Sequence, residues 1–271
     1  MRGCIVFTRA TSEEMFVSSS ECRLACRRGD FSSQTSGQCN GFAQANLCIL
    51  PKECAYDFLL FCVRNPKPCP LLHVLEEGQF VFGQDIDVRS DLPKYRVYEN
   101  GVLQEGELTS IESLWRPDFV TFVIGCSFSF EEAMGRAGLP LRHVETRRNV
   151  PMYNTNIPCA QAGVFSGNMV VSMRPMTPAQ ALKAVEVTSR YPRVHGAPVH
   201  VGTPSDIGVA DIDKPDYGEQ VEIFPGEIPV FWACGVTPQA IVMKSKPSVC
   251  ITHAPGCMLV LDTRNDELSL C

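Results

Sequence analysis

The chain has 271 residues, of which 45% are hydrophobic and 20% are charged, with a formal net charge of −6 and 14 cysteines. This composition excludes a disordered chain, and the length allows a real hydrophobic core in one large domain or two small ones. Nucleic acid is excluded as the main partner because phosphate binding requires a basic field. The longest apolar run, residues 119–125, is far too short for a membrane span, so no membrane partner is expected.

The cysteines exceed the usual content but stay below that of a small disulfide-linked scaffold. No pair has the CxxC spacing, and several cysteines lie in apolar, helix-like surroundings where a thiol acts as a small hydrophobe. The N-terminal residues also lack the long apolar core of a secretory signal. We therefore expect mostly reduced thiols in an intracellular protein, cytoplasmic or from the mitochondrial matrix.

Helix signals in chain order are capping boxes, early prolines and apolar positions that share one face. They predict helices over residues 12–28 (with a Thr11–Glu14 capping box), 51–65, 127–138 and 177–190. Apolar or alternating runs predict strands. They cover residues 47–50, a hairpin over 95–103 around Asn100-Gly101, and residues 119–124, 164–173, 197–201, 228–233, 240–243, 249–252 and 258–261. Residues 67–92 and the acidic stretch 205–227 are expected to be mainly loops. This alternation, with strands clustered at the end, predicts a mixed α/β (α+β) protein.

Nine short motifs follow one another along most of the chain. They are QANLCILP (44–51), DFLLFC–RNPKPCPLL (57–72), DLPKYRVY (91–98), GCSFSFE (125–131), VPMYNTNI (150–157), VVSMRP (170–175), HGAPVHVGTP (195–204), PGEIPVFWACGVTPQ (225–239) and ITHAPGCM (251–258). In this order they resemble the D-glutamate cyclase family, also called the hydro-lyase family. The match is to the stand-alone form, without the C-terminal domain of the vertebrate cyclase.

The resemblance implies a larger three-layer αβα lobe, residues 1–138 and 205–271, with a smaller inserted two-layer α+β lobe at residues 139–204. It also implies a cofactor-independent lyase for a small amino or hydroxy dicarboxylic acid, with D-glutamate closing to 5-oxo-D-proline and releasing water. The expected partner is that small dicarboxylate, and a homodimer is compatible with this form. No metal is expected, since His195 and His200 are five residues apart with no third ligand at a telling spacing.

A reaction of this kind needs a base, an acid and donors for the carboxylates. The GCSFSFE motif reads as a strand, a tight turn and a helix N-terminus, where free N–H groups favour an anion. Cys126, Ser127 and Ser129 are the substrate-binding candidates there. The alternative is a capped helix whose serines satisfy their own backbone.

Three further residues carry candidate roles that the sequence leaves open. Arg174 follows a buried strand and could bind a substrate carboxylate or form a structural ion pair. His200 lies in an apolar strand and could be the base or a core histidine. Glu227, just before another strand, is the candidate acid.

The FWACGVTPQ motif places Cys234 directly after a buried strand, where open α/β sheets bind ligands. Cys234 is a catalytic candidate, with His253 as a base beside it, and the alternative is a loop packed with small residues. The remaining substrate-binding candidates are polar side chains in or next to these motifs: Tyr153, Asn156, Thr237, Gln239 and His253.

Three functions follow from these candidates. The leading hypothesis is the cofactor-independent lyase. A non-catalytic carboxylate-binding module would need the same pocket, and the sequence cannot separate the two. The third hypothesis is a thiol-dependent enzyme built on Cys126 or Cys234.

Overall fold

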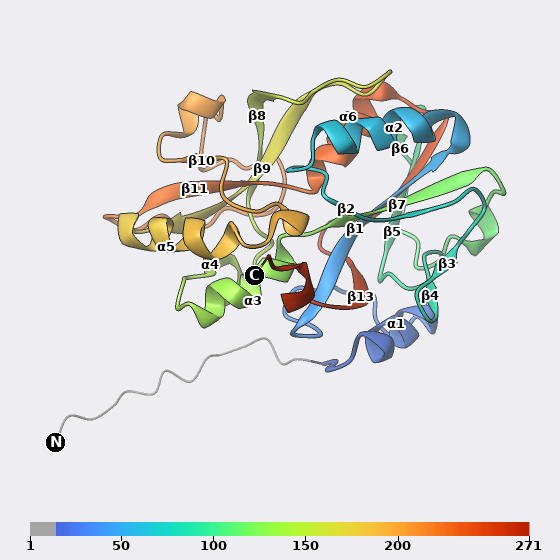
Figure 1. The fold of residues 1–271 in the computed structure, drawn as a ribbon, viewed down its shortest axis with the longest axis horizontal. Coiled ribbons are helices and arrows are strands. Elements are labelled where there is room, and N and C mark those ends of the chain that lie inside the picture. Colours follow the sequence, from blue (N-terminus) through green and yellow to red (C-terminus); the bar gives the residue numbers. More distant parts are fainter. Residues whose placement is uncertain (1–14, 271) are drawn as a thin grey trace.

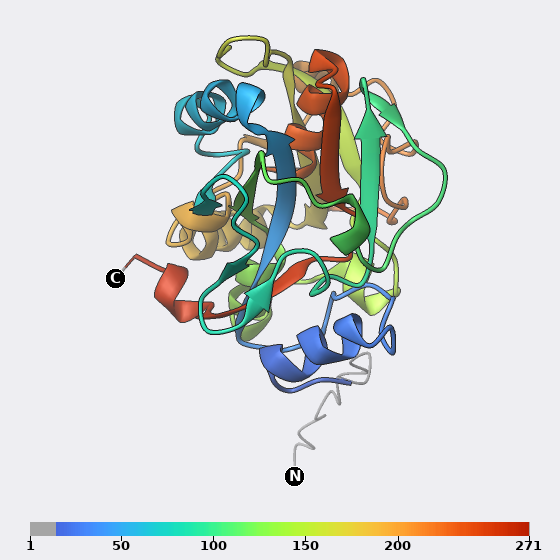
Figure 2. The same ribbon diagram turned by 90° about the vertical axis from the view of Figure 1, so that its right-hand side faces the viewer.

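The computed structural model describes residues 15–270, and its largest sheet has seven strands in the order β2-β7-β1-β12-β5-β6, with β13 also paired to β1. All of these pairings are antiparallel. The strands are β1 (Phe42–Pro51), β2 (Leu71–Leu75), β5 (Tyr95–Glu99), β6 (Val102–Leu103), β7 (Phe119–Gly125), β12 (Val249–His253) and β13 (Leu259–Arg264). Figure 2 shows β1 in blue running through the middle of the molecule beside β12 in red.

A second antiparallel sheet has four strands in the order β10-β11-β9-β8. These strands are β8 (Met152–Pro158), β9 (Asn168–Met176), β10 (His200–Val201) and β11 (Ile228–Ala233). A small third sheet pairs β3 (Val81–Phe82) with β4 (Ile86–Asp87). Figure 1 shows the four-stranded sheet beside the seven-stranded one.

The α-helices within residues 15–270 are α1 (Ser19–Arg27), α2 (Lys52–Arg64), α3 (Phe128–Arg136), α4 (Arg142–Glu145), α5 (Pro178–Thr188) and α6 (Val236–Ser245). Short 3₁₀ turns cover Glu112–Leu114, Pro192–Val194, Pro204–Ile207 and Asp266–Leu268. In Figures 1 and 2, α2 and α6 lie toward the top of the molecule and α3 toward the bottom. None of the helices in the described residues is long and apolar enough to cross a bilayer.

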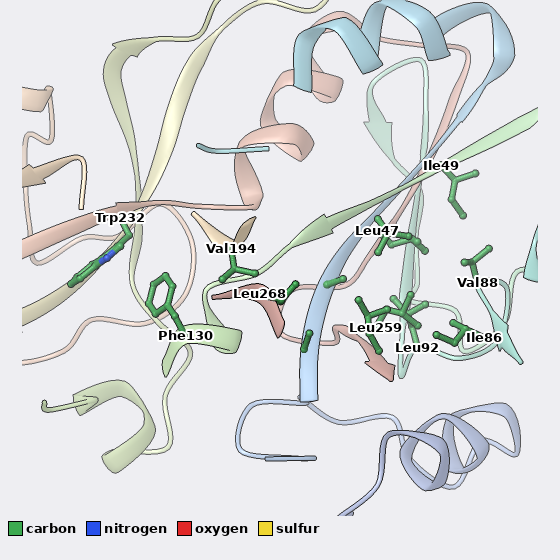
Figure 3. Close-up of a cluster of buried hydrophobic side chains, with 14 of the residues drawn as sticks. Leu47, Ile49, Ile86, Val88, Leu92, Phe130, Val194, Trp232, Leu259 and Leu268 are labelled. Atoms are coloured by element: carbon green, nitrogen blue, oxygen red, sulfur yellow. The ribbon is translucent and has the colours of Figure 1, made fainter. Parts of the chain in front are cut away.

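Strand β1 separates two parts of the core because successive side chains of a strand point to opposite faces. Leu47 and Ile49 join the larger cluster drawn in Figure 3, while Cys48 and Leu50 join the cluster under α2. The larger cluster extends to Phe130 of α3 and to Trp232 of the second sheet. The two sheets therefore share one continuous hydrophobic core.

The structure confirms the mixed α+β class, the strands at residues 119–124 and 228–233, and the Asn100-Gly101 hairpin between β5 and β6. It also confirms the capping box of α5, in which Thr177 and Gln180 bond reciprocally. Helix 51–65 corresponds to α2, and Pro51 is its N-cap as well as the last residue of β1.

Two predicted elements were wrong. The first helix begins at Ser19 and not at residue 12, since Ser18 accepts the Glu21 N–H as its N-cap. The Thr11–Glu14 box lies outside the described residues. Residues 240–243 belong to helix α6 and not to a strand, because a short apolar run does not distinguish a buried strand from a buried helix.

Four strands were not predicted from the sequence, and a fifth was assigned to the other lobe. Strand β8 lies in the VPMYNTNI stretch, for which no strand was predicted. Strands β2, β3 and β4 lie in the 67–92 region, which was expected to be mainly loop. Strand β11 pairs with β9 in the four-stranded sheet, although its residues were assigned to the larger lobe. The strands of this sheet thus extend beyond residues 139–204, and the division into two lobes stays a prediction.

Candidate functional site

Two strand-to-helix connections of the same form meet in the interior. The Cys126 junction, residues 125–128, joins β7 to α3, and the Cys234 junction, residues 233–236, joins β11 to α6. Their N-cap residues have similar backbone angles, with φ −61° and ψ −21° at Ser127 and φ −66° and ψ −4° at Gly235. Neither N-cap makes a side-chain capping hydrogen bond. The Ser129 and Thr237 N–H groups bond to the Cys126 and Cys234 carbonyls. The Phe128 and Val236 N–H groups are therefore the ones in each first turn that can face a ligand.

Each cysteine places its sulfur beside the N–H of the residue two positions further on. Burial raises the pKa of Cys126 to about 12, which the Phe128 N–H opposes and the neighbouring Cys234 reinforces. Burial likewise raises the pKa of Cys234 to about 11, which the Val236 N–H and the Arg174 charge oppose. Both thiols are thus neutral at pH 7 in the free protein.

One face of the second sheet connects the two junctions. Ser172 lies directly opposite Met152, so their side chains share a face, and Arg174 shares it two residues further along β9. The Cys234 thiol contacts Met152 Sδ at 3.4 Å. At the other end, Arg174 donates to Ser172 Oγ at 3.1 Å and to Ser127 Oγ at 3.2 Å. A continuous path of contacts therefore runs from Cys234 to the Cys126 junction.

Asn46 of β1 holds the two junctions together. Its side-chain amide donates to the Gly125 carbonyl at 2.9 Å. The same amide lies against Gly235, where a Cβ would come within 2.1 Å of Nδ2. Asn46 lies within the QANLCILP motif and was not among the residues predicted to form the site. A buried amide inside an apolar strand was the available signal, because such a group needs a specific partner.

Arg174 belongs to a buried charge cluster that the sequence reasoning also missed. Its Nη2 lies 2.5 Å from Glu131 Oε1, and His143 Nε2 lies 3.0 Å from the same oxygen. Burial raises the pKa of Glu131, but the His143 and Arg174 charges outweigh it and lower that pKa to about 2. The Arg174 side chain is 1% exposed, and its Nε has no hydrogen-bond partner among the described residues. Of the two expectations for Arg174, the ion pair is present and one donor is left over.

Ser129 and Thr237 mainly bind nearby backbone. Ser129 Oγ accepts the Gln44 N–H at 3.0 Å, which ties α3 to β1. Thr237 Oγ1 accepts the Val170 N–H at 3.0 Å and donates to the Cys234 carbonyl at 2.7 Å. Both side chains are buried, so they stabilise the backbone of the two junctions and do not face a ligand.

Gln239 lies near the start of α6 and contacts His253 of β12, which pairs with β1 on the side away from β7. Gln239 Nε2 donates to the His253 carbonyl at 3.2 Å, and His253 Nδ1 accepts the Leu47 N–H at 3.1 Å. Burial lowers the pKa of His253 to about 4. The ring is therefore neutral at pH 7, and one of its nitrogens is already engaged.

The structure does not bring His200 and Tyr153 to the two junctions. His200 lies opposite Phe231 and Phe231 lies opposite Met173, so His200 shares the face of β9 that Arg174 does not use. Tyr153 packs on that same other face and donates from its hydroxyl to the Ile212 carbonyl at 2.7 Å. The strand register separates both residues from Arg174.

Glu227 and Asn156 also lie elsewhere. Arg142 donates to both Glu227 carboxylate oxygens, at 2.6 and 2.7 Å. Hydrogen bonds from Arg142 lower the pKa of Glu227, whereas a general acid needs a raised one. Asn156 packs against Gly208. Neither side chain contacts a junction residue.

A cavity of about 380 Å³ lies beside α3, and its lining includes Phe128 of the Cys126 junction but neither Cys126 nor Cys234. Its charged lining residues are Glu131, Glu132, Arg136 and Glu145. Three carboxylates against one guanidinium disfavour a dicarboxylate ligand. No group of three His, Cys, Asp or Glu side chains in residues 15–270 is arranged to hold a metal ion.

Comparison with known proteins identifies the class to which this fold and site belong. Residues 120–262 match the family model described as D-glutamate cyclase. A protein of Methylobacterium sp. (strain 4-46) is 54% identical over 98% of this chain and 100% of its own length, and one of Bordetella petrii is 59% identical over 92% and 95%. Both carry the name "Putative hydro-lyase". A nitrogen repressor-like protein from Methanococcus jannaschii aligns with a TM-score of 0.36 at 8% identity, too low to support an argument.

The chain belongs to the D-glutamate cyclase family, whose relatives cited above are named as hydro-lyases. The expected resemblance is thereby confirmed. The match to these relatives covers nearly all of the chain.

Proposed function

We propose that the protein is a hydro-lyase for a small amino or hydroxy dicarboxylic acid, with D-glutamate as the first candidate. The observation that carries the proposal is the convergence of the two cysteine junctions beside the buried cation Arg174. Helix N-termini offer free N–H groups and the positive end of the helix dipole, so this place favours a carboxylate. Family membership supports loss of water as the class of reaction.

Closing D-glutamate to 5-oxo-D-proline forms a bond between the amine nitrogen and the side-chain carboxyl carbon and releases one oxygen as water. A base must take a proton from the ammonium group, and an acid must protonate the leaving oxygen. We assign these roles to Cys126 and Cys234, which lie at the two helix N-termini. For a hydroxy acid, the base would take the proton beside the carboxylate and the acid would protonate the leaving hydroxyl.

A non-catalytic carboxylate-binding module is the second candidate. The raised pKa values of both thiols favour it, because a neutral thiol is a poor base until its environment changes. Such a module would use the same N–H groups and would leave its ligand unchanged.

The test incubates the pure protein with D- and L-glutamate, both aspartates and the matching hydroxy acids. Mass spectrometry detects 5-oxoproline and unsaturated acids, while thermal unfolding detects binding. Cys126→Ser and Cys234→Ser should abolish product, and Cys54→Ser in the half-buried α2 position serves as the control. Stabilisation by an acid without product supports the binding module, and the absence of both effects contradicts the proposal.

A further inference from the structure

The two cysteine junctions differ in direction although they share one form. In Figures 1 and 2, α6 lies toward the top of the molecule and α3 toward the bottom. Their first turns nevertheless meet near Asn46, which bonds to Gly125 and touches Gly235. The N-termini of α3 (nine residues) and α6 (ten residues) thus approach one place from opposite sides.

Each helix N-terminus brings one thiol. A carboxylate shared by the Phe128 and Val236 N–H groups would have a sulfur at each side, because Cys126 and Cys234 lie at these same N–H groups. Cys126 and Cys234 are both buried at 8% exposed, which is slightly more than Arg174, Ser127 and Asn46 around them. The two cysteines therefore lie at the less deeply buried edge of this cluster.

A second observation points to an anionic ligand. Arg174 is almost fully buried, yet its Nε has no hydrogen-bond partner among the described residues. Its neighbour Glu131 already binds Nη2 and His143. A carboxylate bound next to this face would be attracted by the positive charge of Arg174. It would also help Glu131 to neutralise that buried charge.

We infer that Cys126 and Cys234 form an acid–base pair that exchanges the α-hydrogen of a bound 2-amino dicarboxylate and inverts its α-carbon. This inference rests on the carboxylate site of the proposed function and adds a second activity to it. One sulfur first releases its proton to solvent. The resulting thiolate takes the α-hydrogen as a proton, and the C–H electrons pass into the carboxylate as an enediolate. The opposite thiol then gives its proton to the other face of the carbon. The composition is unchanged, and the two sulfurs exchange protonation states.

Groups other than the thiols are less suited to this step. His253 has a pKa of about 4 and accepts a hydrogen bond from Leu47. Glu131 is an ionised carboxylate held by Arg174 and His143. The helix N–H groups would stabilise the charge that develops on the enediolate. The raised thiol pKa values match a weakly acidic carbon better than a carboxylate would.

The experiment follows D- and L-glutamate in D₂O by proton NMR, with chiral chromatography and a 5-oxoproline assay on the same samples. The intact protein should replace the α-hydrogen of both enantiomers with deuterium and interconvert them. Cys126→Ser should slow exchange from one enantiomer at least about 100-fold, and Cys234→Ser should slow it from the other. Cys54→Ser should behave as the unmodified protein. A merely structural effect would slow both enantiomers equally.

Five results separate this inference from the proposed function. Exchange together with 5-oxoproline supports both. Exchange without any dehydration product supports the thiol pair and contradicts the lyase. Product without exchange overturns the thiol pair alone, and so does an equal loss for both enantiomers in variants whose circular dichroism is unchanged. Neither exchange nor product overturns both.

Discussion

The side-chain amide of Asn46 lies directly against the backbone of Gly235, where a Cβ would approach Nδ2 to 2.1 Å. The same amide donates to the carbonyl of Gly125, the residue before Cys126. One side chain of the central strand therefore sets the distance between the two cysteine junctions.

Replacing Gly235 with alanine should destabilise the protein by about 1–3 kcal/mol, the usual cost of overpacking a buried position. The φ of −66° suits alanine, so the clash with Asn46 is the physical reason. Chemical denaturation measures the change. The double variant with Asn46→Ala removes the clashing amide and should recover part of the loss. Additive effects of the two substitutions would argue against the contact.

Replacing Glu131 with glutamine should cost about 3–5 kcal/mol of unfolding free energy at pH 7, because Arg174 then keeps a buried charge without its partner. The control is Glu132→Gln on the same helix, whose partner Arg136 is largely exposed. The control should lose less than about 1 kcal/mol. Equal losses of unfolding free energy in the two variants would show that the buried ion pair stabilises the protein no more than the exposed one.

The protein should lose stability in two ranges as the pH is lowered. Burial lowers the pKa of His195 and of His253 to about 4 from 6.5, so the unfolded chain binds more protons and stability is lost as the pH falls from about 6.5 to 4. The pKa of Glu131 is lowered from 4.5 to about 2, so its contribution is lost as the pH falls from about 4.5 to 2. His253→Asn should flatten the upper window, since asparagine takes up no proton there. Urea titrations at several pH values measure both slopes, and an unchanged upper slope in this variant would contradict the assignment.

The variant His200→Ala tests whether His200 is the catalytic base, as the sequence predicted, or lies outside the site, as the structure places it. A base at His200 would make the variant slower by orders of magnitude. The register instead puts His200 on the face of β9 away from Arg174, so we expect turnover within about threefold of the unmodified rate. Initial rates of product formation measure it. A large loss at unchanged melting temperature would return His200 to the mechanism.

Local sequence patterns correctly predicted many of the helices and strands. The strand, turn and helix start of GCSFSFE are all present around Cys126. The second junction was recognised only up to Cys234, since the apolar run in α6 was interpreted as a strand. Periodicity alone does not resolve such a run.

Which predicted residues lie in the candidate site depends on how the strands pair, and no local sequence pattern shows this pairing. His200 and Arg174 both lie in apolar strands, and only the pairing through β11 puts them on opposite faces. The sequence also left the ion-pair partner of Arg174 unassigned, and the structure shows that it is Glu131 of α3. Asn46 was not predicted as a site residue because its partners, Gly125 and Gly235, lie about 80 and 190 residues away along the chain.

The most direct measurement is a crystal structure of the protein with D-glutamate or its hydroxy analogue bound. Our account predicts a carboxylate within hydrogen-bond distance of the Phe128 and Val236 N–H groups, between the sulfurs of Cys126 and Cys234. A ligand bound instead in the acidic cavity beside α3, or on the His200 face of the second sheet, would contradict it.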